Sequence, residues 1–292
     1  MSATVIALVL VSALLHAVWS ASIKGSPSPL AFNVTQTLVT VPLAALGLLG
    51  FDWHVLTPRL WACAAGTGVS HGLYLFWLSR ALERADLTLA YPIVRSTPAL
   101  LPLLAVPLLG EVPSPIGALG IAVVVSGVWL VHGAGLSSST LTAPNLRYAW
   151  LTLLATVGYS LSDKAAMAAL DAGGYHGPLP PALAWYCVLS LGSSCVFLPL
   201  ALRRSAREPA GRGRSAELGR AALAVIVGLT GYGLILEAFR LAPASYVVAV
   251  RQSSVLFAAW IGVAFLGERP DRGRLAGAAA TVVGVALIGF GG

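Results

Sequence analysis

The sequence predicts an all-α polytopic membrane protein, with ten transmembrane helices arranged as two inverted five-helix repeats. Three observations predict this fold class. Of the 292 residues, 57% are hydrophobic and only 10% are charged, and the mean hydropathy is +0.84, whereas about a quarter of the residues of a soluble protein are charged. The chain also contains ten apolar segments and an internal repeat. This composition excludes a sizeable soluble domain, a disulfide scaffold and a nucleic-acid-binding domain.

The first five apolar segments are each long enough for a bilayer crossing, which takes about 20 apolar residues in a helix. They lie at 3–23, 29–50, 60–80, 87–109 and 115–133. No basic residue precedes the first segment, so we expect a transmembrane helix there rather than a cleaved signal peptide. The fourth segment contains Pro92 and Pro98 on either side of Arg95. Because proline removes a backbone donor and clashes with the preceding turn, we predict a discontinuous helix that kinks near Arg95.

The second five segments lie at 147–168, 180–202, 219–240, 244–266 and 273–291, after a Gly/Ser-rich stretch at 133–145. The polar run 203–220 contains six arginines, and we predict that it forms a flexible loop. Cys63, Cys187 and Cys195 lie in apolar segments without metal-ligand spacing, so we interpret them as small buried hydrophobic residues. The pairs Gly68-x3-Gly72 and Gly273-x3-Gly277 favour close helix packing.

An internal repeat divides the chain into residues 1–134 and residues 147–292, with the arginine-rich run inserted in the second half. Leu109-Gly110-Glu111 recurs 157 positions later as Leu266-Gly267-Glu268, and the segment from Trp19 to Lys24 resembles the segment from Tyr159 to Lys164. Five crossings per half is an odd number, so the two halves lie inverted in the membrane. Inverted repeats are typical of alternating-access transporters, whose substrate site lies between the halves near the bilayer midplane.

The distribution of Lys and Arg predicts the orientation of the chain. Loops after the odd-numbered helices hold thirteen basic residues: Lys24, Arg80, Arg84, Arg147, the six arginines of 203–220, Arg269, Arg272 and Arg274. Loops after the even-numbered helices hold only Arg59 and Arg240. Because basic residues are enriched in cytoplasmic loops, this count places the odd-numbered loops in the cytoplasm and both termini outside.

Several motifs together resemble the drug/metabolite transporter superfamily, specifically its EamA-type members of two five-helix repeats. The motifs are Leu14 to Trp19 ahead of Lys24, Tyr91 to Arg95, Leu109 to Glu111, Tyr159 to Lys164, Arg251 to Phe257 and Leu266 to Glu268. The resemblance covers essentially the whole chain. It implies transport of metabolites, amino acids or drugs, in many members by export. Members are often drawn with both termini in the cytoplasm, which conflicts with the count of basic residues, and we keep the count.

Two arginines within apolar segments are the first candidates for substrate binding. Arg95 and Arg251 each lie eight or nine residues into their segments, which at about 1.5 Å per residue is roughly 12 Å deep and close to the middle of the bilayer. An arginine at that depth costs at least about 2.5–3.5 kcal/mol, so it needs a partner, water or a function. Guanidinium groups bind carboxylates and phosphates. The alternative is that each arginine binds freed carbonyl groups or a buried acid.

Acidic residues that could couple transport to an ion gradient are scarce. Asp163 and Glu237 are the two that fall within predicted helices, and we select them as coupling or counter-ion residues. Glu237 and Arg240 are three residues apart on one helix face, which also favours a simple ion pair. Asp163 and Lys164 are adjacent, and neighbours on a helix do not face each other, so each needs a different partner.

Further polar and aromatic residues within the apolar segments could line a cavity. The substrate-binding candidates beside the two arginines are Tyr91, Gln252, Ser253, His16, Tyr74 and Tyr159. Other candidates are Asn33, Gln36, His71, Trp77, Trp185, Tyr186 and Tyr232. For the histidines the alternative is a hydrogen bond between helices, and for the aromatic residues it is packing or an interfacial belt.

The sequence as a whole favours a secondary transporter of a small anionic or zwitterionic metabolite in the inner (plasma) membrane, acting as an exporter by alternating access. No phosphate-binding loop, cofactor motif, metal site or catalytic constellation is present in the sequence. One alternative is an exporter of uncharged or amphipathic compounds with structural arginines. Another is a membrane-embedded enzyme or a non-transporting accessory protein. The expected partners are a small-molecule substrate and the lipid bilayer but no nucleic acid, and a homodimer is left open.

Overall fold

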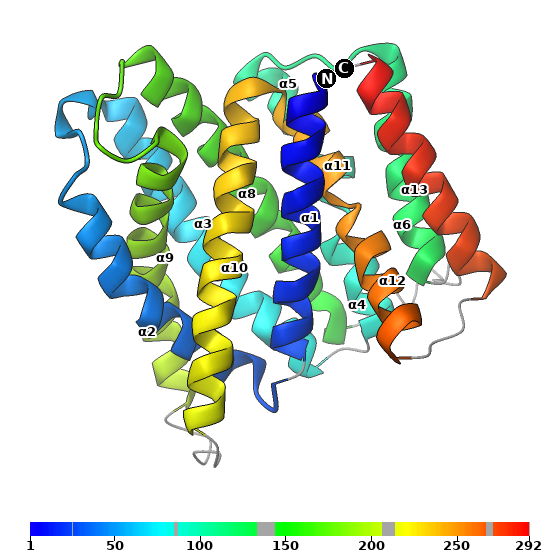
Figure 1. Cartoon of the computed structure of the whole chain (residues 1–292), viewed down its shortest axis with the longest axis horizontal. Coiled ribbons are helices and arrows are strands. Elements are labelled where there is room, and N and C mark those ends of the chain that lie inside the picture. Colours follow the sequence, from blue (N-terminus) through cyan, green and yellow to red (C-terminus); the bar gives the residue numbers. More distant parts are fainter. Residues whose placement is uncertain (25, 85–86, 133–143, 206–213, 267–270, 292) are drawn as a thin grey trace.

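The computed structural model is an all-helical bundle, as predicted (Figure 1). It describes residues 1–24, 26–84, 87–132, 144–205, 214–266 and 271–291. The helices of the first repeat are α1 (Ala3–Lys24), α2 (Pro29–Leu48), α3 (Pro58–Arg84), α4 (Leu87–Val94), α5 (Thr97–Leu109) and α6 (Pro115–His132). Those of the second are α8 (Arg147–Ala172), α9 (Pro181–Ser205), α10 (Arg214–Leu241), α11 (Ala244–Arg251), α12 (Ser254–Leu266) and α13 (Arg272–Gly291). Short 3₁₀ turns, η1 (Trp53–Val55) and η2 (Pro144–Leu146), precede α3 and α8.

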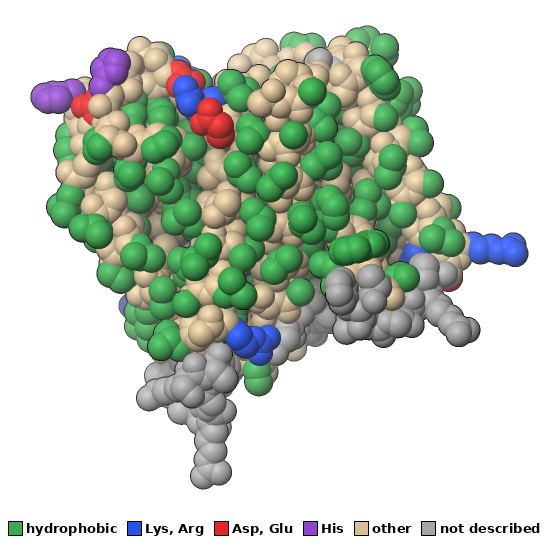
Figure 2. Space-filling view, viewed as in Figure 1, with side chains coloured by type: hydrophobic (Ala, Val, Ile, Leu, Met, Phe, Trp, Pro, Cys, Tyr) green, Lys and Arg blue, Asp and Glu red, His purple; other side chains and the backbone are tan. Residues whose placement is uncertain are grey.

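The helices make ten crossings, because α4 with α5 and α11 with α12 each form one span broken in its middle. Seven spans within the described residues are long and apolar enough to cross a membrane: α1, α2, the broken span of α4 and α5, α9, α10, the broken span of α11 and α12, and α13. Hydrophobic side chains cover the middle of the face shown in Figure 2, and the coloured charged side chains lie toward its upper and lower margins. The chain is therefore a multi-pass membrane protein.

Local sequence explains where several helices begin and end. Proline is the first residue of α2, α3, α6 and α9, a position where its missing N–H is not needed. The Ser28 side chain also accepts a hydrogen bond from the Ala31 N–H, 3.3 Å, and caps α2. At the other end of a helix, Gly110 adopts a left-handed conformation with φ of 69° and terminates α5. This turn places Glu111 just outside the helix.

The break between α4 and α5 confirms the discontinuity predicted from the prolines. At this point the Ser96 N–H donates to the Ile93 carbonyl, 3.0 Å, which closes a tight four-residue turn. The Ser96 hydroxyl donates to the Pro92 carbonyl, 2.7 Å, and so satisfies an acceptor near the break. The break between α11 and α12 was not predicted. It has the same form, with the Ser253 N–H donating to the Val250 carbonyl, 3.0 Å.

The prediction that residues 203–220 form a loop was wrong at both ends. Helix α9 continues through Arg203 and Arg204 to Ser205, and α10 begins at Arg214. A helix satisfies its own backbone outside the bilayer as well as inside it, and basic side chains in the last turn of α9 interact favourably with the helix dipole. The remaining part of the predicted loop, 206–213, lies outside the described residues.

The two repeats interlock rather than forming separate bundles. The most extensive helix pairs join the halves: α6 with α13, α3 with α8 and α9, α1 with α10, and α2 with α9. Glycines allow the closest of these approaches, as predicted: a Cβ on Gly277 would lie 2.6 Å from the Gly127 carbonyl, and one on Gly68 would lie 3.1 Å from the Gly192 backbone. Each half therefore completes the packing of the other.

Two of the three cysteines are buried as predicted, and one is not. Cys63 and Cys187 are buried, whereas Cys195 is exposed on α9. An apolar side chain on an outward face of a membrane helix lies against lipid, so the low polarity of a thiol requires no burial inside the protein. The prediction for Cys195 was wrong for this reason.

The chain ends lie together on one face, opposite the end of α9 and the start of α10 (Figure 1). The Met1 ammonium donates to the Gly289 carbonyl, 3.2 Å. We call this side the terminus face. The opposite side contains the basic ends of α9 and α13, and we call it the basic face.

Candidate functional site

Two arginines lie at the two helix breaks, near the middle of the bundle. Arg95 directly follows α4, and Arg251 is the last residue of α11. Both are only partly buried, and both face cavities inside the bundle. Since the breaks belong to opposite repeats, the inverted fold brings two positive charges toward one central region. The depth of the two residues in their segments predicted that each lies near the middle of the bilayer.

The Arg251 guanidinium lies beside the rings of Tyr232 and His16. Its Cζ lies 5.2 Å from the centre of the Tyr232 ring, and its Nη2 lies 3.5 Å from Nδ1 of His16. Its buried Nε has no hydrogen-bond partner among the described residues. Arg251 therefore keeps donor capacity for a ligand.

The Arg95 guanidinium bridges the two breaks. Its Nη1 donates to the Ser254 hydroxyl at the start of α12, 2.9 Å, and its Cζ lies 5.7 Å from the centre of the Tyr91 ring. Neither Arg95 nor Arg251 forms an ion pair with a carboxylate of the described residues. Both positive charges are thus left without a neutralising partner in direct contact.

Two cavities meet beside these arginines. The first encloses about 790 Å³ of space that no protein atom fills, including the part open to solvent, and the second about 680 Å³. They share five lining residues: His16, Trp19, Tyr74, Tyr159 and Arg251. Only the second cavity is lined by Arg95, Tyr91 and Gln252. No aspartate or glutamate of the described chain lines either cavity, so their charged lining is purely cationic.

The second cavity extends from the helix breaks toward the basic face. Its lining includes Ser20, Leu82 and Ala90, which lie near the basic-face ends of α1, α3 and α4. By contrast, the α11 residues from Ala244 to Val250 are buried. Helix α11 borders this cavity only through Val248 and Arg251 near the break, so its first half, toward the terminus face, is enclosed.

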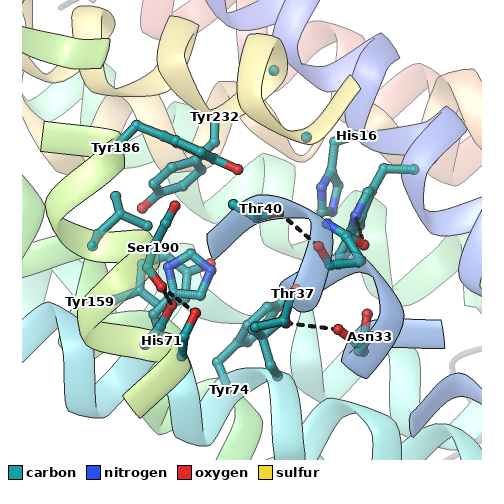
Figure 3. A pocket seen from close by; sticks show the side chains of 18 of the residues that line it. His16, Asn33, Thr37, Thr40, His71, Tyr74, Tyr159, Tyr186, Ser190 and Tyr232 are labelled. Carbon is teal, nitrogen blue, oxygen red and sulfur yellow. Dashed lines mark hydrogen bonds between the residues drawn. The ribbon is translucent and has the colours of Figure 1, made fainter. Parts of the chain in front are cut away.

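A polar wall of the first cavity was only partly predicted (Figure 3). Helix α2 contributes Asn33, Gln36, Thr37 and Thr40, and α9 contributes Ser190, Ser193 and Ser194. Asn33 and Gln36 were candidates from the sequence, but the hydroxyl residues were not. Their spacing of three and four positions is a helical stripe, and that periodicity is the signal that could have identified them. Trp19 was also missed as a lining residue, although it lies in a quoted motif.

Aromatic rings form a further wall of the first cavity. His71 stacks on Tyr159 with ring centres 4.6 Å apart, and the Tyr74 and Tyr232 rings approach His71 edge-on at 5.6 and 5.5 Å. His71 and Tyr232 line the first cavity. The histidine ring thus packs among tyrosines, as the alternative interpretation of the sequence allowed, while also facing the cavity.

Asp163 lies behind this wall, not in it. Its side chain on α8 is fully buried, with 0% exposure. It accepts hydrogen bonds from Trp185 Nε1, 2.8 Å, and from the Tyr232 hydroxyl, 2.5 Å. Because the Tyr232 ring contacts Arg251, one residue separates this carboxyl group from the arginine. The adjacent Lys164 instead lies beside Glu111, so the two neighbours on α8 have different partners, as predicted for adjacent helix positions.

Other candidate residues line neither cavity. Glu237 forms an ion pair with Arg240, 3.0 Å, and Arg240 also binds Asp171, 2.8 Å. The ion pair matches the alternative predicted from their spacing, and the Glu237 side chain is 32% exposed. Ser253 is buried at the second break and lines neither cavity. Trp77 likewise belongs to neither lining.

Comparisons with known proteins cover the whole molecule. The model of the EamA-like transporter family matches the chain twice, at residues 3–133 and 148–290. Among curated proteins compared with the chain, none matches it. A solved crystal structure of another protein superposes with a TM-score of 0.76 at 16% sequence identity, over 98% of this chain and 96% of the other. At that identity the superposition supports the fold alone.

Proposed function

Since the chain belongs to the EamA-like transporter family and is thus a membrane transporter of small solutes, we propose that it exports a small anionic or zwitterionic metabolite. We further propose that transport is secondary, proceeds by alternating access and takes place in the inner (plasma) membrane. Arg95 and Arg251 bind the anionic group of the solute. Tyr91, Gln252, His16, Tyr74 and Tyr159 contact the rest of it, and Asp163 is the candidate coupling residue.

One observation supports the charge of the solute: two arginines line the joined cavities, and no described carboxylate does. A buried cation without a counter-ion is unfavourable, so an anionic ligand that enters the cavity supplies the missing charge. Guanidinium groups can also form paired hydrogen bonds with carboxylate or phosphate groups. Neutral hydroxyl and amide groups of α2 and α9 are available for the uncharged part of the solute.

Proteoliposome uptake of a panel of anionic, zwitterionic and neutral solutes tests this proposal. We expect Arg251→Gln and Arg95→Gln to reduce uptake of anionic solutes by roughly 10- to 100-fold, because a hydrogen bond to a charged group contributes about 1.5–3 kcal/mol. Arg240→Gln is the matched control, since Arg240 lies in an exposed ion-pair cluster outside both cavities. Its uptake should equal that of the parent protein.

Unchanged uptake of anionic solutes by both cavity variants, in protein that remains folded, would contradict the assignment of the arginines. The direction of transport is tested separately by comparing efflux from intact cells with uptake into everted membrane vesicles. Accumulation in everted vesicles is the result expected for an exporter.

A second candidate function rests on an apolar groove beside the first cavity. The groove lies between α2, α9 and α10, is lined by residues such as Leu43, Leu183 and Leu229, and shares Thr40 and Tyr186 with the first cavity. It favours an exporter of uncharged or amphipathic compounds that enter from the bilayer. In that case neutral solutes of the panel would be transported, and both arginine variants would retain that activity.

A further inference from the structure

A charged contact joins the two repeats at the terminus face. Glu111 follows the end of α5 in the first repeat, and Lys164 lies on α8 in the second. The Lys164 ammonium lies 3.5 Å from the Glu111 carboxylate, and the two side chains are only 17% and 10% exposed. Burying two charges is unfavourable unless further hydrogen bonds satisfy them. The remaining contacts of both groups therefore indicate what the pair does.

Both side chains bind the junction between α10 and α11. The Lys164 ammonium donates to the Phe239 and Ala242 carbonyls, 2.5 and 3.0 Å, at the end of α10. The Glu111 carboxylate accepts a hydrogen bond from the Ala244 N–H, 2.7 Å, at the start of α11. A cation thus caps one helix C-terminus and an anion caps the next helix N-terminus, which is the favourable arrangement for both helix dipoles.

The capped half-helix has Arg251 at its other end. Helix α11 has eight residues, so about 12 Å of rigid helix separates the Glu111 contact from the candidate substrate site. The α11 residues nearest the pair, Ala244 to Val247, are buried and line neither cavity, and only Val248 and Arg251, closer to the break, border the second cavity. The Glu111–Lys164 pair therefore lies on the closed side of the site.

We infer that Glu111 and Lys164 are positioning residues for Arg251: together they hold the α10–α11 junction, and with it α11, closed against the terminus face, and their contacts with that junction must break before the cavity opens there. This inference rests on the proposed alternating-access function. An uncharged contact lies nearby: the Tyr246 hydroxyl of α11 accepts a hydrogen bond, 2.8 Å, from the N–H of Ser114, which precedes α6. It reinforces the closed position but cannot supply the two caps.

The test measures access to α11 and needs no substrate. Val247 on α11 has 0% exposure, so Val247→Cys is introduced after Cys63, Cys187 and Cys195 are each replaced by Ser. A membrane-impermeant thiol reagent is then applied to either membrane face in turn. We expect Lys164→Met to accelerate labelling from the terminus face by about tenfold or more, because loss of one member of a buried charged pair strongly favours the open arrangement. Labelling from the basic face should not accelerate.

Three further variants distinguish a specific positioning role of the Glu111–Lys164 pair from a general destabilisation of the helix packing. Lys164→Arg keeps a cationic donor and should restore slow labelling. Arg240→Met removes an arginine from the ion-pair cluster at the same end of α10, and should leave the labelling rate unchanged. Glu111→Ala should accelerate labelling as Lys164→Met does, and the double variant should be no faster than either single variant, since residues that act as one unit are not additive.

Two results would overturn the inference: an unchanged labelling rate in folded Lys164→Met protein, or strictly additive effects of Glu111→Ala and Lys164→Met. Thermal unfolding in detergent establishes that each variant is folded. Because labelling is measured without a transported solute, failure of the solute panel would not affect this result. Conversely, if Lys164→Met left the labelling rate unchanged while the solute panel showed transport, only the positioning role would be rejected and the proposed function would stand.

Discussion

At the scale of single residues, the most informative arrangement is the chain of contacts from Asp163 through Tyr232 to Arg251. The Tyr232 hydroxyl donates to the fully buried carboxyl group, and the face of its ring contacts the guanidinium. Tyr232 thereby links a buried acid to a cavity arginine without an ion pair between them. Tyr232 is therefore the side chain that contacts both the buried acid and the arginine.

Tyr232→Phe isolates the hydroxyl contribution, since it keeps the ring against Arg251. We expect the free energy of unfolding to fall by about 1–3 kcal/mol, because an oxygen of Asp163 loses a hydrogen-bond donor inside the protein. Thermal unfolding in detergent measures this effect. Tyr74→Phe on the same cavity wall is the matched control and should change stability less. Equal melting temperatures for Tyr232→Phe and the parent protein would contradict the importance of the hydrogen bond.

At the scale of helices, the close crossing of α6 and α13 depends on glycine. A Cβ on Gly120 would lie 2.8 Å from the Gly284 carbonyl, and a Cβ on Gly127 would lie 2.7 Å from the Gly277 carbonyl. In return, a Cβ on Gly284 would lie 2.8 Å from the Gly120 carbonyl. The two helices of opposite repeats thus use equivalent glycines against each other, as the 157-residue offset of the repeat suggests.

Gly127→Ala should therefore separate α6 from α13. We expect a loss of about 1–3 kcal/mol in stability, the usual effect of overpacking a tight contact. Gly233→Ala on α10 is the control, because a Cβ there meets nothing within 4 Å. That substitution should be neutral or stabilise the helix by up to about 1 kcal/mol. A similar melting temperature for both variants in detergent would refute the close-packing argument.

The sequence predicted the helices better than their interruptions. Prolines identified the break at Arg95, since a missing donor and a steric clash are local properties of the chain. The break at Ser253 has no proline, and it depends on packing between the repeats. Its only sequence signal was the repeat itself, because Ser253 stands 157 positions after Ser96. Likewise, periodicity could have predicted the polar stripe of α2. The partners of Lys164 could not be predicted in this way, because they are distant in the sequence and meet only in the folded chain.

At the scale of the whole molecule, the structure separates the chain ends from the basic face. Both ends lie on the terminus face (Figure 1), while the basic ends of α9 and α13 lie on the opposite one. Basic residues remain preferentially in the cytoplasm during membrane insertion. The count of basic residues therefore still predicts an external terminus face.

A reporter fused after Gly292 tests this orientation. We expect alkaline phosphatase, which is active only outside the cytoplasm, to be active in the fusion. A fluorescent protein that matures only in the cytoplasm should be dark at the same position. The opposite pair of signals would reverse the orientation and would place the Glu111–Lys164 pair on the cytoplasmic side. The labelling experiment would then retain its logic with the two faces exchanged.

The interlocking of the repeats has a consequence for biosynthesis. While the ribosome is still producing the second half, α1, α3 and α6 lack the helices α10, α8 and α13 against which they pack. During this interval Arg95, which lines a cavity and binds the Ser254 hydroxyl of the second half in the finished molecule, would lack that partner. Until the helices of the second half emerge, the nascent first half would therefore carry a cation inside an apolar segment without its partner, which is unfavourable in a bilayer.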